Sequence, residues 1–262
     1  MQDEQEIQTL RRYVKAADEE FHIALAFHEA WKPTAYDKAL QDRIGQSYAA
    51  NTFRVIAAAL RREMLLALVR LWDKNRQALR MDRVGEILGK PCVIDALVAE
   101  VAQDWDRPTR LFTDEDSTEE DRRQMLDAIR NHEADAARQA AATKRVEIGE
   151  VVSLIRKYVD GEGHDTLKKL KRLRHERLAH REIETRPAAT PTLGSATIEE
   201  VENFYQDMAK LIRLLKGAVG RTGYDPDDTS QIHAKNARLF WASVRGEGTE
   251  GHPSYRPPPV FC

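Results

Sequence analysis

Residues 51–72 read NTFRVIAAALRREMLLALVRLW and carry an apolar residue at every third or fourth position. The same spacing extends back to Ile44, and apolar side chains that recur in this way share one face of an α-helix. We therefore predict one long helix from about Lys38 to Asp73, closed by Trp72, at the centre of a hydrophobic core. The positions in register are Ile44, Tyr48, Phe53, Ile56, Leu60, Met64, Leu68 and Leu71.

Helical signals also account for the segments on either side of this stretch. A helix from Glu4 to Trp31 should end at Lys32-Pro33, because proline lacks the amide hydrogen that a helix interior needs. Capping boxes, in which a hydroxyl and a carboxylate satisfy backbone donors at a helix start, are predicted at 117–120 and 197–200. No strand-like alternation is present, so the predicted class is all-α. Further helices are predicted over 82–88, 93–105, 117–142 (an exposed arm with few large apolar residues) and 148–159, and from about 165, 197 and 225, the last reaching about 245.

The composition narrows the classes of protein to which the chain can belong. It has 262 residues, 42% hydrophobic and 32% charged, which is enough for a sizeable core. The net charge of -2 gives no bulk attraction to nucleic acid or a membrane, so any phosphate-binding site must be local. Only Cys92 and Cys262 are present, no signal peptide is recognisable, and the apolar run 64–72 is too short to cross a bilayer. These features predict a soluble, cytoplasmic protein with no membrane segment.

The helix that begins near Asp165 combines an apolar face with basic residues. At about 100° per residue, its leucines fall on one arc that faces the core or a partner, and basic residues lie within or beside that arc. Burying unpaired guanidinium groups costs on the order of several kcal/mol, which indicates a bound anion or an acidic partner. The alternative is a helix that emerges into water at its basic C-terminal end. The leucines are Leu167, Leu170, Leu173 and Leu178, and the basic residues are Arg174, Arg177, His180 and Arg181.

The segment Leu173-Arg-His-Glu-Arg-Leu-Ala-His180 resembles the signature of the HEPN superfamily, which is an arginine, a polar residue, three to five further positions and a histidine. Residues 66–74, Leu-Ala-Leu-Val-Arg-Leu-Trp-Asp-Lys, are similar to part of the corresponding helix of the AbiU-like abortive-infection branch. The resemblance covers roughly residues 15–216 and implies an antiparallel HEPN-like helical bundle with extra helices. We accordingly expect a HEPN-like helical domain over 1–222, a C-terminal helix over 223–245 and a flexible tail over 246–262.

The resemblance also implies a reaction and the residues that perform it. Arg174 and His180 would be the catalytic pair of a metal-independent endoribonuclease, with His175, Arg177 and Arg181 as supporting or phosphate-binding residues and with no cofactor or metal. The family more often has Asn or Asp at the position of His175, which leaves the orienting role of that side chain open. RNA supplies its own nucleophile, the 2′-hydroxyl, so the protein needs a group that transfers protons near neutral pH and a cation for the phosphate. The implied protein is a toxin or antiviral effector that acts on RNA and has an antitoxin or other protein as a candidate partner.

The spacing of Arg174 and His180 has a geometric consequence. On a regular helix the two positions lie about 120° apart and about 9 Å along the axis. Both side chains reach one phosphate only through a long arginine arm, a distorted turn or a second subunit. A homodimer that brings two such pairs together is the simplest of these arrangements, and the resemblance implies a homodimer as well.

Other histidine and carboxylate patterns give alternative interpretations. His175-Glu176 followed by His180 is one residue too long for the zinc-protease pattern His-Glu-x-x-His, which places both imidazoles on one side of a helix. Glu19-x-x-His22, with Glu29 further on, is half of a di-iron motif, but no second copy is present, so we interpret it as a surface charge cluster. A non-catalytic HEPN-like protein that binds RNA or nucleotide, or that pairs with a toxin or antitoxin, stays open.

Overall fold

The computed structural model describes most of the chain. The described residues are 2–45, 47–73, 78–105, 118–173, 196–220, 226–247, 249 and 251–256. Within these ranges the regular secondary structure is helical, and extended backbone pairs only in an isolated bridge between Trp72 and Arg80. The predicted all-α class is confirmed. None of the helices in the described part is both long and apolar enough to cross a membrane.

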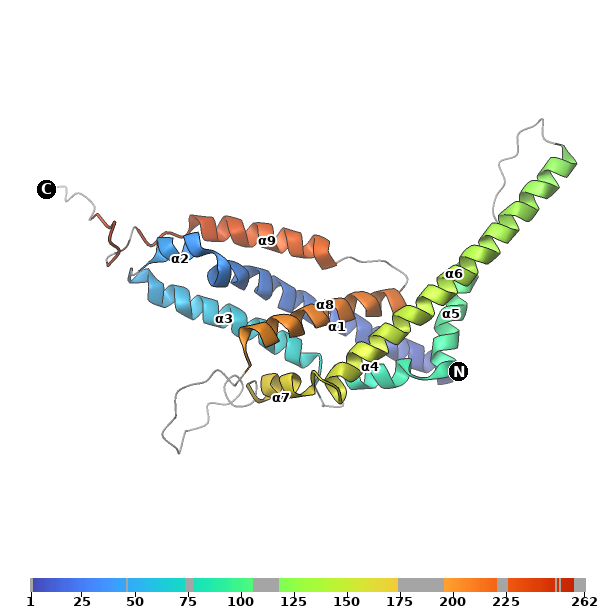
Figure 1. Cartoon of the computed structure of the whole chain (residues 1–262), viewed down its shortest axis with the longest axis horizontal. Coiled ribbons are helices and arrows are strands. Elements are labelled where there is room, and N and C mark those ends of the chain that lie inside the picture. Colours follow the sequence, from blue (N-terminus) through green and yellow to red (C-terminus); the bar gives the residue numbers. More distant parts are fainter. Residues whose placement is uncertain are drawn as a thin grey trace.

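Figure 1 shows how the helices are arranged. Helix α1 runs through the body of the molecule and contacts α3, α8 and α9, while α4, α5 and α7 lie near the lower half of α6. The far half of α6 extends beyond the other helices as an arm. The helices are α1 (Gln2–Tyr36), α2 (Lys38–Ile44), α3 (Ala49–Arg70), α4 (Met81–Leu88), α5 (Pro91–Trp105), α6 (Glu119–Val159), α7 (His164–Leu173), α8 (Ile198–Val219) and α9 (Pro226–Ser243).

One main hydrophobic core joins helices from both ends of the chain. Its largest fully buried side chains include Phe21 of α1, Met64 and Leu68 of α3, and Phe204 of α8. A second, smaller core forms where α2, α3 and α9 meet, and its buried members are Leu40, Ile44, Ala50, Ala237 and Trp241. Trp241 also donates a hydrogen bond from Nε1 to the backbone oxygen of Ala30 at 2.9 Å, which fixes α9 on α1.

The single helix predicted over 38–73 is wrong, because the chain breaks it into α2 and α3. Gly45 ends α2 with a φ of 55°, a backbone region that glycine adopts without the steric cost of a Cβ. Tyr48 and Ile56, predicted to face the core, are exposed. A break in one helix shifts the faces of the residues around it, so the apolar spacing no longer describes one continuous stripe.

Two predicted helix ends are also shifted. Helix α1 continues through Pro33 to Tyr36, because a proline near the end of a helix removes one hydrogen bond and the last turn still forms. The capping box of α6 pairs Thr118 with Asp121, one residue later than predicted. The box that pairs Thr197 with Glu200 at the start of α8 is confirmed.

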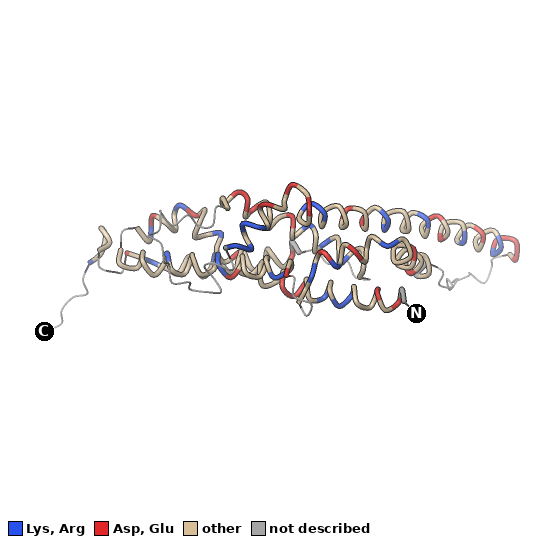
Figure 2. The backbone as a smooth tube through the Cα atoms, turned by 90° about the horizontal axis from the view of Figure 1, so that it is seen from below, with Lys and Arg blue, Asp and Glu red and all other residues tan. Residues whose placement is uncertain are grey.

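Helix α6 is one helix of 41 residues that joins the two predicted helices 117–142 and 148–159. Its far half is the predicted exposed arm. Acidic and basic residues alternate along this arm in Figure 2, and some form pairs three residues apart, such as Arg130 with Asp127. Such mixed charge is typical of a solvated helix rather than a surface of one sign.

Candidate functional site

The five residues predicted to act on RNA lie outside the described residues. They are Arg174, His175, Arg177, His180 and Arg181. Helix α7 leads directly into them, so its placement decides where the predicted motif begins. This helix contacts α3 and the end of α6.

Two leucines anchor α7 in the main core. Leu167 and Leu170 are 4% and 1% exposed, which confirms that these two leucines of the predicted arc face inward. Burying a leucine side chain stabilises a fold by about 1.5–3 kcal/mol. Lys168 and Arg172 are exposed on the opposite side, so α7 is an amphipathic helix with a basic outer face.

The turn before α7 depends on a close contact between Gly163 and the ring of Tyr158. A Cβ at Gly163 would lie 2.6 Å from Cε1 of Tyr158, closer than real side chains approach. That ring packs against Trp72 and Phe204, and its hydroxyl donates to Oδ2 of Asp207 at 2.5 Å. Burial and the hydrogen bond to Asp207 raise the pKa of Tyr158, so its hydroxyl stays protonated. Glycine therefore lets α7 fold back tightly onto the end of α6.

An ion pair connects the polar side of α7 to the start of α8. The Nζ of Lys169 lies 2.7 Å from Oε1 of Glu200. Glu200 also accepts a hydrogen bond from the backbone N–H of Thr197 at 2.8 Å, which caps α8. The hydrogen bonds from Lys169 and from the backbone of Thr197 lower the pKa of Glu200 and outweigh the opposing effect of burial. The last described turns of α7 therefore lie beside the first turn of α8.

The chain becomes strongly basic as α7 leads into the predicted motif. Residues 168–181 contain seven Lys or Arg and one Glu. Of the described cations, Lys168 lies near Asp165 and Lys169 pairs with Glu200. The charge of Lys171 acts on Asp82 of α4. In the sequence, four of these seven cations lie in α7 and the other three follow Leu173, where Glu176 is the one acidic residue.

A buried ionic network includes Glu202, two residues further along α8. Nε2 of His28 lies 3.1 Å from Oε2 of Glu202, and Nδ1 of His28 lies 3.3 Å from Oε1 of Glu29. His28 and Glu29 are 1% and 4% exposed. Ser230 of α9 donates a hydrogen bond to the same Glu29 oxygen at 3.1 Å. The His28 ring also stacks on Tyr205, with ring centroids 3.7 Å apart. The network joins α1, α8 and α9.

The two carboxylates favour the protonated form of His28. Burial by itself lowers the pKa of His28, but the hydrogen bonds and charges of Glu202 and Glu29 outweigh it, so the pKa is raised. Burial likewise raises the pKa of Glu29, but the hydrogen bond from His28 and the charge of Lys32 lower it overall. Both ring nitrogens of His28 are used in these contacts. His28 is therefore a buried structural cation rather than a group that is free to transfer protons.

A row of aromatic rings leads from this network to the surface. The Trp31 ring lies 6.1 Å from the His28 ring, and the Tyr36 ring lies 5.7 Å from the Trp31 ring in an edge-on contact. Trp31 is 5% exposed and Tyr36 is 58% exposed. The guanidinium of Arg61, on α3, lies over the Trp31 ring at 5.9 Å. An exposed aromatic ring and a cation thus both contact the same buried tryptophan.

The sequence-based interpretation missed this network. Glu29 was assigned to a surface charge cluster, whereas it is buried. Glu19 is exposed as predicted, and His22 contacts the backbone oxygen of Asp18 at 2.8 Å. The signal for His28 was its position, seven residues after the buried Phe21 on the core face of α1. Among the described side chains, no group of three or more His, Cys, Asp or Glu is arranged to hold a metal ion.

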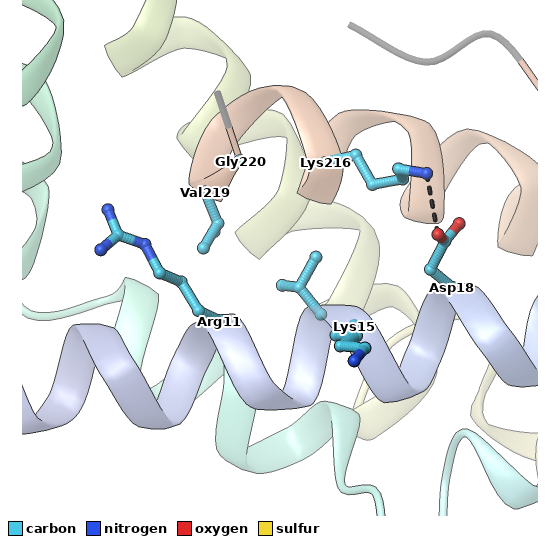
Figure 3. A pocket seen from close by; sticks show the side chains of 7 residues that line it. Arg11, Lys15, Asp18, Lys216, Val219 and Gly220 are labelled. Atoms are coloured by element: carbon cyan, nitrogen blue, oxygen red, sulfur yellow. Dashed lines mark hydrogen bonds and ion pairs between the residues drawn. The ribbon is translucent and has the colours of Figure 1, made fainter. Parts of the chain in front are cut away.

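A groove of about 640 Å³ lies between the first half of α1 and the end of α8. Three basic residues line it, namely Arg11, Lys15 and Lys216 (Figure 3). Lys216 reaches Asp18 with a distance of 2.8 Å between Nζ and Oδ2, and Arg11 pairs with Glu100 at 2.5 Å. Lys15 lies 3.9 Å from Glu19, so all three cations have a carboxylate partner and this groove has little free charge to attract phosphate.

The described part of the chain is thus an all-α bundle, and the sequence that follows α7 contains an Arg-x5-His segment. The family model HEPN_AbiU2, described as AbiU2, matches residues 7–240. The chain belongs to this family, which confirms the predicted resemblance and makes it an abortive-infection-related HEPN protein. It matched none of the curated proteins and none of the solved structures with which it was compared.

Proposed function

We propose that this protein is a metal-independent endoribonuclease that cleaves RNA with Arg174 and His180. Its membership of the HEPN AbiU2 family is the observation that carries the proposal. The placement of α7 supports it, because a helix anchored on its apolar side leads into a segment with an excess of positive charge. Such local charge is what a chain with a net charge of -2 needs in order to bind a polyanion.

The residue types of the motif suit RNA cleavage without a metal. His180 accepts the proton of a ribose 2′-hydroxyl, the 2′-oxygen bonds to phosphorus, and the bond from phosphorus to the 5′-oxygen breaks. The leaving 5′-oxygen takes a proton from a second imidazole, and Arg174 neutralises the charge that grows on the phosphate. The products are a 2′,3′-cyclic phosphate and a free 5′-hydroxyl. His175, Arg177 and Arg181 would hold the motif or neighbouring phosphates.

A homodimer supplies the second imidazole in this scheme. Arg174 and His180 would lie about 120° apart around a regular helix and about 9 Å along it. The two side chains of one protomer therefore do not easily reach the same phosphate. Two copies that face each other across a two-fold axis would place the arginine of one protomer near the histidine of the other. The cellular role that fits is a toxin or antiviral abortive-infection effector, held inactive by an antitoxin or another protein partner.

The proposal is tested by RNA cleavage in the presence of EDTA. We expect the wild-type protein to cleave single-stranded RNA in EDTA and to leave cyclic-phosphate ends that mass spectrometry detects. His180→Ala should cleave at least about 100-fold more slowly, because a proton-transfer group contributes about 10²–10⁴-fold. His132→Ala, which alters an exposed histidine on the α6 arm, is the matched control and should cleave at the wild-type rate.

Two results would contradict the proposal. Cleavage by His180→Ala at the wild-type rate would contradict the assignment of His180 as a catalytic residue. Loss of cleavage in EDTA would contradict the claim that the reaction needs no metal. Binding of RNA without cleavage, lost in Arg174→Ala, would replace the proposal with the non-catalytic HEPN-like protein. Sedimentation of the wild-type protein as a monomer at assay concentrations would refute the shared site.

A further inference from the structure

We propose that Tyr36 and Arg61 form a nucleotide-binding site for single-stranded RNA, in which a base stacks on Tyr36 and the adjacent phosphate is held by Arg61. This inference rests on the proposed function, because the site would bind the same RNA strand at a distance from the Arg174–His180 pair. It assigns a role to described residues that lie outside the family motif.

Arg61 is a half-buried cation without a fixed acceptor. Its Nε is buried and has no hydrogen-bond partner among the described residues. Other arginines of the body differ in this respect, since Arg70 pairs with Glu20 and Arg80 pairs with Asp82. Leaving a half-buried guanidinium without an acceptor is unfavourable, and a phosphate that accepts from its terminal amino groups would offset part of that cost. Arginine suits a phosphate because its planar group donates two hydrogen bonds at once.

Tyr36 supplies an exposed ring that its neighbours hold in place. It lies in the last turn of α1 and is 58% exposed, although tyrosine rings are usually partly covered. The buried Trp31 contacts it edge-on, with an interplanar angle of 75°. The same Trp31 ring lies beneath the Arg61 guanidinium. Bases of single-stranded RNA are unstacked, so an exposed ring beside an arginine is a typical surface for binding them.

Charge on the neighbouring residues is consistent with an anionic ligand. Glu202 acts electrostatically on both Tyr36 and Arg61, but its carboxylate lies 3.1 Å from Nε2 of His28 and favours the protonated form of that ring. Its negative charge is therefore largely balanced. The Arg61 guanidinium remains the cation at this position that no carboxylate holds in a described ion pair.

Contacts also link this surface to the helix that leads into the motif. Glu202 lies two residues after Glu200 on α8, and Glu200 pairs with Lys169 of α7. The first turns of α8 thus lie between the end of α7 on one side and Tyr36 with Arg61 on the other. An RNA strand that is cleaved at the motif after α7 would therefore extend past the first turns of α8 toward Tyr36 and Arg61.

The site is tested by RNA affinity in the uncleaving His180→Ala protein, measured by fluorescence anisotropy with a short labelled single-stranded RNA. We expect Tyr36→Ala to weaken binding by roughly 5- to 100-fold, the range that loss of one base–aromatic stack produces. Tyr36→Phe keeps the ring and should bind within about twofold of the parent. Arg61→Gln should weaken binding and reduce the slope of log affinity against log salt by about 0.7, the value for one phosphate contact on a single strand.

Matched controls alter the same residue types elsewhere. Tyr48→Ala removes another exposed tyrosine, and Arg62→Gln alters the neighbouring exposed arginine on α3. Both should leave the affinity and the salt slope unchanged. In the cleaving protein, Tyr36→Ala should raise KM and leave kcat nearly unchanged, since the stack binds substrate and transition state alike.

The outcomes separate this inference from the proposed function. If the wild type cleaves RNA but Tyr36→Ala and Arg61→Gln both bind RNA with normal affinity, the nucleotide site alone is overturned. Absence of both RNA binding and cleavage in the wild type overturns the nucleotide site and the proposed function together. Loss of self-association in Tyr36→Ala with unchanged RNA affinity would make this surface a protein interface and would also overturn the inference.

Discussion

We predict opposite effects of the same substitution at two glycines, one in the α6–α7 turn and one within α6. Gly163 lies against the Tyr158 ring, where a Cβ would approach Cε1 to 2.6 Å and Cδ1 to 2.7 Å. Gly149 lies in the exposed part of α6, where a Cβ would meet no atom within 4 Å. The tyrosine ring is 3% exposed and has packed neighbours on several sides, so it cannot move aside freely.

The magnitudes follow from these surroundings. Gly163→Ala should cost about 1–3 kcal/mol by overpacking, less about 0.4–1 kcal/mol from the stiffer unfolded chain, for a net loss of roughly 1–2 kcal/mol. Gly149→Ala should stabilise the protein by about 0.5–1 kcal/mol, because alanine is the better residue in a helix interior. Urea unfolding followed by circular dichroism would measure both changes.

The test for a steric origin is the second substitution Tyr158→Leu, which removes the ring. In that background the cost of Gly163→Ala should largely disappear, and the coupling between the two changes should be about 1 kcal/mol or more. A Gly163→Ala protein as stable as the wild type, or an unchanged cost in the Tyr158→Leu background, would refute the account of how α7 is placed. Because α7 leads into the motif, Gly163→Ala should also slow RNA cleavage, whereas Gly149→Ala should not.

Three further predictions concern the polar contacts around α8. The free energy of unfolding should fall as pH rises from about 6.5 through the raised pKa of His28, since the folded state favours its protonated form, and His28→Gln should lack this step in stability measured against pH. Thr197→Ala should destabilise the protein by about 1 kcal/mol in urea unfolding, because it removes the N-cap of α8. Glu200→Gln retains a side chain that closes a capping box but loses the ion pair with Lys169, so it should cost at most about 0.5 kcal/mol, in a manner that added salt reduces.

Local periodicity predicted the helices that carry one continuous apolar face. The arc of Leu167 and Leu170 is buried as expected, and α8 begins at the predicted capping box. In both segments the hydrophobic residues recur at helical spacing and therefore lie on one side of the helix. The pattern along the chain therefore determines which side is buried.

The break at Gly45 was not predictable from the same signal. Apolar spacing continues from Ile44 into the next helix, and glycine within a periodic pattern is compatible with an unbroken helix. The turn is favoured by contacts that are distant in sequence. A Cβ at Gly45 would lie 3.3 Å from a ring atom of His252, so the residues after α9 close over this turn.

The network of His28, Glu29 and Glu202 lay beyond sequence reasoning for a related reason. His28 and Glu202 are 174 residues apart, and the sequence around one of them gives no sign of the other. A histidine on the core face of a helix is consistent with several partners, including a metal, a carboxylate or a backbone oxygen. Only the packing of α8 against α1 selects the carboxylate.

Contacts with the acidic residues at the start of α8 distinguish basic residues that support the fold from those that we propose act on RNA. Acidic side chains near a helix N-terminus are favourable, and two of them here contact a basic residue of another helix, Glu200 with Lys169 and Glu202 with His28. Those two cations are needed for packing, so their replacement should lower stability, and activity only as a consequence. In our proposal Arg174 and His180 are needed for the reaction instead, so their replacement by alanine should abolish cleavage with little change in the free energy of unfolding. A His180→Ala protein that unfolds much more easily than the wild type would place that histidine with the structural cations and would count against the catalytic assignment.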